Sequence, residues 1–411
     1  MHLRPLSFSL PLLLAGFTLL PLSASEPDKH AGHSHASYPG VQSLDVTGAG
    51  SRLHLLTGES AKEGPQTELW HRSSCDAGAT WSAPVRVGAG QQPPHAAHRG
   101  MDPQIAAAGD RALAVWMTPG TDPFGGGPMA TAISTDGGAT WKPGPNPADD
   151  GSTTGHGFID VAADAAGNFH LTWLDTRNEK RGLRYTRSTD GGQTWSANET
   201  PDPETCECCW NTLATGPDGT VGILYRDKNP RDMAIAWAPQ AGKPWPASIP
   251  VGGFGWQFEG CPHVGGGLAI GGEKGAPVWH ASVWTGTEKN FGVHHLTSSD
   301  GGKSWSTTQQ LGGKTASHPD LAARGSAEVA LAWDVTDAHG SRIEAVLSTD
   351  AGKTWTKATE LTGTGAIASH PRVVATPSGF RIFWTQRSAD GPLTWKSATF
   401  PAPATSQHGA P

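Results

Sequence analysis

The chain has 411 residues, of which 54 are glycine and 33 are proline, and only 16% are charged. This composition is typical of many short strands joined by turns, and it argues against a coiled coil or a predominantly helical protein. The net charge is -7 and no run of Lys or Arg occurs, so we expect neither nucleic-acid binding nor polybasic attachment to a membrane surface.

Residues 1–24 are predicted to be a secretory signal peptide. Arg4 precedes an apolar stretch over 6–22, and small residues follow at 23–25. A membrane anchor is the alternative, but the apolar core is short and no later stretch reaches membrane-spanning length. We therefore expect a protein secreted across the inner membrane, with no membrane span after cleavage. The periplasm is the favoured compartment and the extracellular space the alternative; both permit disulfides.

Residues 25–40 are expected to form a flexible leader. It carries His30, His33 and His35 within the run DKHAGHSH. Such a tract can capture copper or zinc as an accessory metal site. An ordinary disordered tail is the alternative interpretation.

An eight-residue pattern, Ser-x-Asp-x-Gly-x-Thr/Ser-Trp, recurs five times between short alternating apolar runs. The pattern predicts a hairpin turn, because Asp can bond its own turn backbone and Gly accepts a positive φ. The Trp can wedge between neighbouring sheets, so we expect it to be mostly buried. The structural pairs are Asp76 and Trp81, Asp136 and Trp141, Asp190 and Trp195, Asp300 and Trp305, and Asp350 and Trp355.

A second repeat consists of an apolar strand, a turn and a further strand ending in an apolar or aromatic residue. Its seven copies span 41–56, 102–116, 158–173, 211–225, 261–284, 318–333 and 370–384. They are predicted to be the inner strands of an all-β propeller with four antiparallel strands per blade. Seven blades are favoured and six are the alternative. One domain is expected over 41–400, with a disordered tail at 401–411. The N-terminal part is expected to supply the fourth strand of the last blade.

The eight-residue pattern resembles the Asp-box, or BNR repeat, of sialidase-like β-propellers. The resemblance implies that the boxes are structural and lie away from the active site. Sialidase chemistry in that family also needs three Arg, a Tyr nucleophile activated by Glu, and an Asp acid/base. The family's Arg-Ile-Pro motif is absent here, and no Tyr follows Tyr225, the one plausible stand-in. The sequence therefore argues against sialidase activity and leaves open whether the protein is an enzyme.

Cys and His gather near the starts of the inner strands. In a propeller these starts lie around one central channel, so side chains distant in sequence are expected to meet there. Thiolate and imidazole together suit soft or borderline ions, with copper favoured and zinc as the alternative. The predicted metal ligands are Cys206, Cys208, Cys209, Cys261, His263, His156, His318 and His370. Disulfide pairing of the four clustered cysteines, in any of three connectivities, is the alternative.

The Cys-x-Cys-Cys and Cys-Pro-His motifs also resemble those of an uncharacterised exported subgroup of sialidase-like propellers. The favoured hypothesis is an exported, periplasmic propeller that binds copper at its axial rim, in metal handling or a redox role. The alternatives are an exo-sialidase or other glycan-binding or glycoside hydrolase propeller, and a disulfide-stapled interaction scaffold. The expected partners are the metal ion and another exported or outer-membrane protein.

Overall fold

The described part of the chain consists of strands and turns. In the computed structural model it comprises residues 38–61, 66–95, 97–177, 179–238, 244–363 and 365–402, all within one compact unit. No helix in these ranges has the length and hydropathy needed to cross a bilayer. The predicted signal peptide, the three leader histidines and residues 403–411 lie outside the described residues, so those predictions stay predictions.

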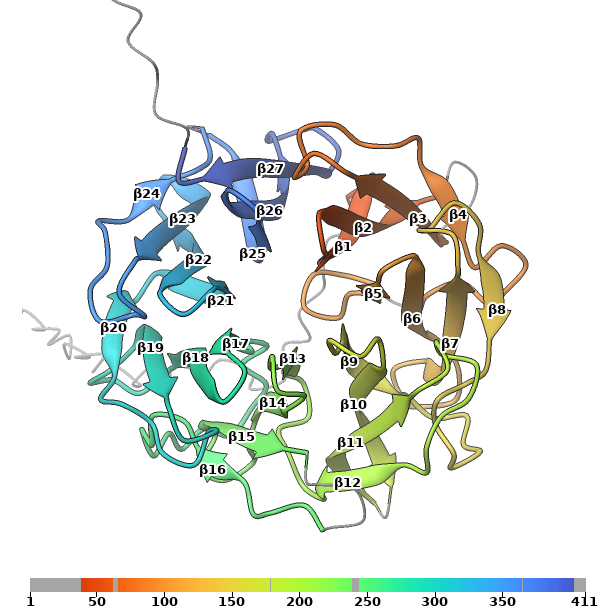
Figure 1. Cartoon of the computed structure of the whole chain (residues 1–411), viewed down its shortest axis with the longest axis horizontal. Helices are drawn as coiled ribbons and strands as arrows, with labels where there is room; N and C mark the ends of the chain where they lie inside the picture. Colours follow the sequence, from red (N-terminus) through yellow and green to blue (C-terminus); the bar gives the residue numbers. More distant parts are fainter. Residues whose placement is uncertain are drawn as a thin grey trace, which may run out of the picture. The chain divides into compact units, whose positions relative to one another are not determined.

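The strands follow one another in antiparallel units, and Figure 1 shows the first strand of each unit innermost and the fourth outermost. The first strands are β1 (Val41–Ala49), β5 (Gln104–Ala108), β9 (Gly157–Ala163), β13 (Thr212–Thr215), β17 (Gly267–Glu273), β21 (Ala316–Arg324) and β25 (Ile367–Thr376). The second strands are β2 (Arg52–Ser60), β6 (Arg111–Pro119), β10 (Phe169–Arg177), β14 (Val221–Arg226), β18 (Ala276–Thr285), β22 (Glu328–Asp337) and β26 (Gly379–Arg387). The third strands are β3 (Thr67–Ser74), β7 (Gly126–Ser134), β11 (Lys180–Ser188), β15 (Met233–Trp237), β19 (Gly292–Ser298), β23 (Gly340–Ser348) and β27 (Thr394–Phe400). The fourth strands are β4 (Val85–Val87), β8 (Lys142–Gly144), β12 (Glu199–Asp202), β16 (Ile249–Pro250), β20 (Gln309–Gly312) and β24 (Thr359–Glu360).

This strand order confirms the predicted all-β propeller with four antiparallel strands per blade. The predicted inner hairpins are the first and second strands, and each Asp-box joins a third strand to a fourth. The two C-terminal units share one sheet, because Ser341 of β23 forms a parallel pair with Ile367 of β25. Because this pair joins the last two units into one sheet, a count of the sheets does not give the number of blades. The predicted seven blades therefore stay a prediction.

The hydrophobic core is divided among the interfaces between neighbouring units. The first strands contact one another in the order β1, β5, β9, β13, β17, β21 and β25, and β25 contacts β1. Each core cluster combines side chains of adjacent units, and the cluster of Leu44, Leu55, Val374 and Phe383 joins the first unit to the last. Burial between units thus holds the molecule together, as expected when no single sheet can cover both its faces.

The Asp-boxes form the same hydrogen bonds in all five copies. The Ser Oγ donates to the Asp carboxylate at 2.7–2.8 Å. It accepts the N–H of the Gly four residues on at 2.8–2.9 Å. The Asp carboxylate accepts the N–H of the Thr or Ser four residues on at 2.8–2.9 Å. In the first copy, the hydroxyl of Thr80 is the main cause that lowers the pKa of Asp76 to about 2.

The box tryptophans pack against the core clusters, but none of them is fully buried. Trp81, Trp141, Trp195, Trp305 and Trp355 are all half-buried. Each packs one part of its ring on a core cluster. The other part stays accessible, because the box lies near the outer edge of its sheet. The fully buried tryptophans lie on second strands instead, at Trp116, Trp173, Trp279 and Trp333.

Closure between the two ends of the described chain uses few backbone bonds. Gly40 forms one parallel bridge with Leu393, and Val41 N–H donates to the Leu393 carbonyl at 3.0 Å. Among the described residues this contact is a bridge and not the predicted fourth strand. Side chains reinforce it, since Arg372 of β25 donates to Asp45 of β1 at 2.8 Å.

Candidate functional site

Four cysteines and one histidine meet between two loops. Cys206, Cys208 and Cys209 lie in the loop from β12 to β13, and Cys261 and His263 lie in the loop from β16 to β17. The ligand atoms of the first three lie within 4.8 Å of one another, and so do those of Cys208, Cys261 and His263. The structure therefore brings together five of the eight residues that the sequence predicted as one site.

The sulfur spacing suits a shared ion. The Sγ of Cys206 lies 3.9 Å from that of Cys208 and 3.5 Å from that of Cys209. Two sulfurs held at about 2.3 Å from one ion lie roughly 3.8–4.0 Å apart in tetrahedral or trigonal geometry. A disulfide would bring them to about 2.0 Å. All five cysteines are free thiols in this structure, including Cys75, which is exposed on the first Asp-box.

Burial changes sharply across the cluster. Cys206, Cys208 and Cys209 are 0%, 6% and 1% exposed, whereas Cys261 is exposed and His263 is half-buried. The cluster thus has a buried side and a solvent-facing side, and Cys208 belongs to both triads of ligand atoms.

Cationic side chains surround the sulfurs. Arg231 donates from Nη1 to the Cys206 Sγ at 2.9 Å and to Glu207 at 3.1 Å, and Lys228 also pairs with Glu207. Hydrogen bonds from the Cys208 and Cys209 thiols lower the pKa of Cys206, while bonding to its neighbouring thiols raises the pKa of Cys208. The cluster therefore stabilises one thiolate and keeps thiol protons that a metal ion could displace.

His318 and His370 belong to a separate group of possible ligands with Asp334 and are not grouped with the thiols. Their rings stack with centroids 3.8 Å apart and planes 16° apart. The His318 Nδ1 lies 2.7 Å from the Asp334 Oδ2, which also accepts the His370 N–H at 2.9 Å. The ring nitrogens of the two histidines and an Asp334 carboxylate oxygen all lie within 4.8 Å of one another.

His156 belongs to a third group of possible ligands. Its ring is buried with Asp150 and Asp175, and these are the residues with which its ligand atoms cluster. Its Nδ1 contacts the Thr154 carbonyl at 2.8 Å and its Nε2 contacts Asp150 at 3.2 Å. Asp175 is further bonded by Arg177 and Arg184, so this network is already satisfied as an ion-pair cluster.

A pocket near the inner-strand starts, called here the axial pocket, contains the stacked histidines. Its lining also includes Trp210, Arg99, Asp320 and Arg372. Trp210 directly follows Cys209, and its ring centroid lies 5.6 Å from that of His318 and 5.8 Å from that of His370. The axial pocket therefore lies beside the thiol cluster, which consists of Cys206, Cys208, Cys209, Cys261 and His263. Trp210 lines the pocket and directly follows Cys209 of the cluster.

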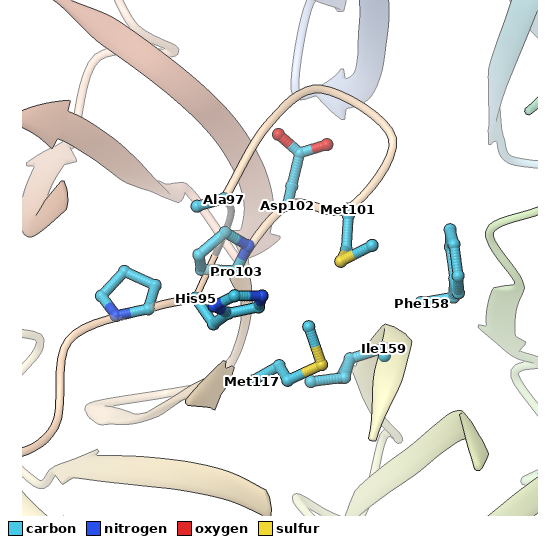
Figure 2. Close-up of a pocket in the computed structure, with 10 residues that line it drawn as sticks. His95, Ala97, Met101, Asp102, Pro103, Met117, Phe158 and Ile159 are labelled. Carbon is cyan, nitrogen blue, oxygen red and sulfur yellow. The ribbon is translucent and has the colours of Figure 1, made fainter. Parts of the chain in front are cut away.

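A second, smaller pocket borders the axial pocket and shares Asp102 and Ile159 with it. Figure 2 shows the side chains of Met101 and Met117 pointing toward each other within its lining. The His95 Nε2 in this lining contacts the Phe124 carbonyl at 2.9 Å.

Tyr225, the plausible stand-in for a sialidase nucleophile, and its neighbour Arg226 both have structural contacts. Tyr225 is fully buried and its hydroxyl donates to Asp202 at 2.5 Å. Burial raises the pKa of Tyr225, which opposes a role as a nucleophilic phenolate. Arg226 is buried and donates to the carbonyls of Val264, Trp284 and Arg231. Neither side chain is available to a sugar in this structure.

The fold and its repeats define a β-propeller with Asp-box turns. Residues 53–252 match the family model described as a BNR repeat-like domain. Together with the fold, this match supports a sialidase-like BNR-repeat β-propeller. No curated protein matches the sequence significantly.

Solved structures of similar fold include two polysaccharide lyases. An ulvan lyase of the family PL25 is 10% identical, with 88% of this chain and 94% of that chain covered and a TM-score of 0.59. The polysaccharide lyase Uly1 is 9% identical, with 90% and 94% covered and a TM-score of 0.52. The Hadza microbial sialidase Hz136 is 18% identical, with 82% and 74% covered and a TM-score of 0.45.

Sequence reasoning missed three residues that shape these sites. Arg231 contacts the buried thiol, Asp334 holds His318, and Trp210 packs against both axial histidines. Trp210 could have been noticed from its position next to Cys209. Arg231 and Asp334 carry no comparable signal, because their partners lie 25 and 16 residues away in the chain.

Proposed function

We propose that this propeller is an exported protein that binds a soft transition metal ion at the thiol cluster, with copper favoured over zinc. The observation that carries the proposal is the convergence of four sulfurs and one imidazole in two triads that share Cys208. Thiolates prefer Cu(I) among the common metal ions, and imidazole accepts either copper state.

The charge around the cluster supports a monovalent soft ion. Three thiolates on Cu(I) carry a net charge of about -2, by the ordinary charges of those groups. Arg231 contacts the Cys206 sulfur directly, and Arg226 lies near enough to favour the thiolate forms of Cys206 and Cys209. These cations would offset the negative complex in a buried place, where an uncompensated charge is costly.

The test is an anaerobic titration of the reduced protein with Cu(I) buffered by bicinchoninate, followed by alkylation and mass spectrometry. We expect bound Cu(I) to protect Cys206, Cys208 and Cys209 from alkylation. The double variant Cys208→Ser/Cys209→Ser should lose more than about 100-fold in affinity, because even the loss of an outer-shell partner costs about 10–100-fold.

Cys75→Ser is the matched control, since Cys75 is a free thiol on an Asp-box outside the cluster. It should bind Cu(I) like the parent protein. Disulfides among the clustered cysteines in protein that also binds no Cu(I) or Zn(II) would contradict the proposal and favour the stapled scaffold.

A glycan-active propeller is the second candidate, and two observations favour it. The ulvan lyase and Uly1 share the fold over most of this chain. The axial pocket also contains a histidine whose Nδ1 is held by the buried carboxylate of Asp334, an arrangement that suits a general base. Arg372 lines the same pocket and could pair with the carboxylate of an acidic sugar.

This second candidate is tested by incubating the protein with ulvan and other uronate polysaccharides and following the absorbance of unsaturated products. His318→Asn should abolish any turnover, and Asn tolerates the positive φ of 50° at this position. We expect no hydrolysis of a sialoside, because the described lining of the axial pocket contains no Tyr and Tyr225 is buried elsewhere. Absence of product and of binding with every acidic polysaccharide would remove this candidate.

A further inference from the structure

The two triads of the thiol cluster differ in what solvent can reach. The buried triad is Cys206, Cys208 and Cys209, and each of its residues is no more than 6% exposed. The rim triad is Cys208, Cys261 and His263, in which Cys261 is exposed and His263 is half-buried. An ion in solution can therefore meet the rim triad first.

Cys208 connects the two triads. Its sulfur lies within 4.8 Å of every other ligand atom in both of them. An ion bound to this sulfur can exchange its remaining ligands one at a time without being released. We propose that a soft metal ion is captured by the rim triad and moves to the buried triad while it stays bound to Cys208. This inference rests on the proposed metal-binding function.

The step is a ligand exchange and leaves the oxidation state of the ion unchanged. Bonds from the ion to the Cys261 Sγ and the His263 ring nitrogen break, and bonds to the Cys206 and Cys209 Sγ atoms form. Each thiol proton displaced from the buried triad passes to a released rim ligand or to solvent. The same exchange in reverse would hand the ion to a small thiol or to a thiol-bearing protein.

Arg231 contacts both loops and so holds them at a fixed separation for this exchange. Its Nη1 donates to the Cys206 sulfur at 2.9 Å, and its Nε donates to the Phe258 carbonyl in the rim loop at 2.8 Å. One buried guanidinium thus ties the loop of the buried triad to the loop of the rim triad. The rim loop also fixes His263 in a left-handed backbone conformation with φ of 52°, which is uncommon for a histidine and typical of an over-determined site.

The experiment measures affinity and exchange rate separately in the full chain. Cu(I) is loaded anaerobically, its affinity is measured against bicinchoninate, and its transfer to excess bicinchoninate is followed by stopped flow. The rim variants are Cys261→Ser and His263→Asn, and Asn is chosen because it accepts the positive φ of His263. Cys206→Ser represents the buried triad, and Cys75→Ser is the control thiol.

We expect the rim variants to slow both loading and transfer by about tenfold, at the lower end of the range over which association rates vary among variants of one interface. Their affinity should change far less than their rates. Cys206→Ser should lose more than about 100-fold in affinity. Cys261→His, which restores a ligand, should recover the exchange rate and so separate ligation from a structural effect.

Two results would overturn the pathway while leaving metal binding intact. If Cys261→Ser lowers affinity as much as Cys206→Ser, Cys261 is a resident ligand and not a transfer ligand. If its rates equal those of the parent protein, the ion reaches the buried triad by another route. A parent protein that binds no Cu(I) would instead defeat the proposed function itself.

Discussion

At the scale of single residues, two sets of tryptophans serve the fold differently. Trp333 on β22 is 1% exposed and belongs to the core cluster between two units. Trp305 closes an Asp-box and is half-buried against the neighbouring cluster. The indole ring of Trp305 therefore covers the edge of the core, whereas the indole ring of Trp333 fills its interior.

Replacing these two tryptophans should separate the roles. Trp333→Ala should lower the free energy of unfolding by about 3–5 kcal/mol, as for other large core truncations. Trp305→Ala should lower the free energy of unfolding by clearly less, because the ring of Trp305 is already partly exposed to water in the folded protein. Denaturant unfolding of the metal-free proteins measures both. Equal losses would show that the box tryptophan is a full core residue.

At the scale of strands, two pairs of buried histidines link second and third strands. His54 on β2 contacts His71 on β3 at 3.0 Å, and His280 on β18 contacts His295 on β19 at 3.3 Å. Burial is the main cause that lowers their pKa, to about 4 for His54 and His280 and about 3 for His71 and His295. One histidine of each pair, His71 or His295, makes an edge-to-face contact with the Asp-box tryptophan of the following unit, Trp141 or Trp355.

These depressed values predict a loss of stability in acid. The pKa of each of these histidines in the folded protein lies below its value of about 6.5 in the unfolded chain. The full contribution of the neutral pairs to the free energy of unfolding is therefore present above about pH 6.5. Their contribution falls as pH drops toward 4, by about 1.4 kcal/mol per pH unit for each histidine. His71→Gln should make the decline of stability between pH 6.5 and 4.5 shallower. His339→Gln, in the exposed turn before β23, is the control and should leave the slope unchanged.

At the scale of the whole molecule, carboxylates on the first strands connect successive units. Asp45, Asp160 and Asp320 each accept a backbone N–H from the first strand of the next unit, at 2.6–2.8 Å. Arg372 on β25 lies among them and donates to Asp45 on β1. Arg372, with Arg99 nearby, therefore compensates several buried carboxylates at the junction of the first and last units.

Removing the positive charge of Arg372 should weaken the contact between the first and last units. Arg372→Met leaves the buried carboxylates uncompensated and should cost about 3–5 kcal/mol in the free energy of unfolding. Asp45→Asn keeps an acceptor for the Ile105 N–H, so the double variant should lose less than the sum of the single changes. Denaturant midpoints of the four proteins test this. Strict additivity would mean that the two side chains stabilise the ring independently.

Much of the site could be predicted from the order of the units. Cys206, Cys208 and Cys209 precede β13, and Cys261 and His263 precede β17, so consecutive units bring them together. His318 and His370 lie near the starts of β21 and β25, which are also consecutive, and they pair with each other. The eight predicted ligands divide into the thiol cluster, the His318 and His370 pair, and the His156 group.

The propeller, the Asp-box turns, the inner hairpins and the gathering of thiols follow from the sequence, because each depends on local spacing or on the order of repeats. The directions of the imidazole rings depend instead on contacts between distant parts of the chain. Pairing shifts register near His318 and His370, and both residues take a positive φ, which turns their rings into a stack held by Asp334. Asp150 and Asp175 likewise hold His156. Asp334 and Asp175 lie on other strands than the histidines they contact, so no local pattern could fix the direction of those rings.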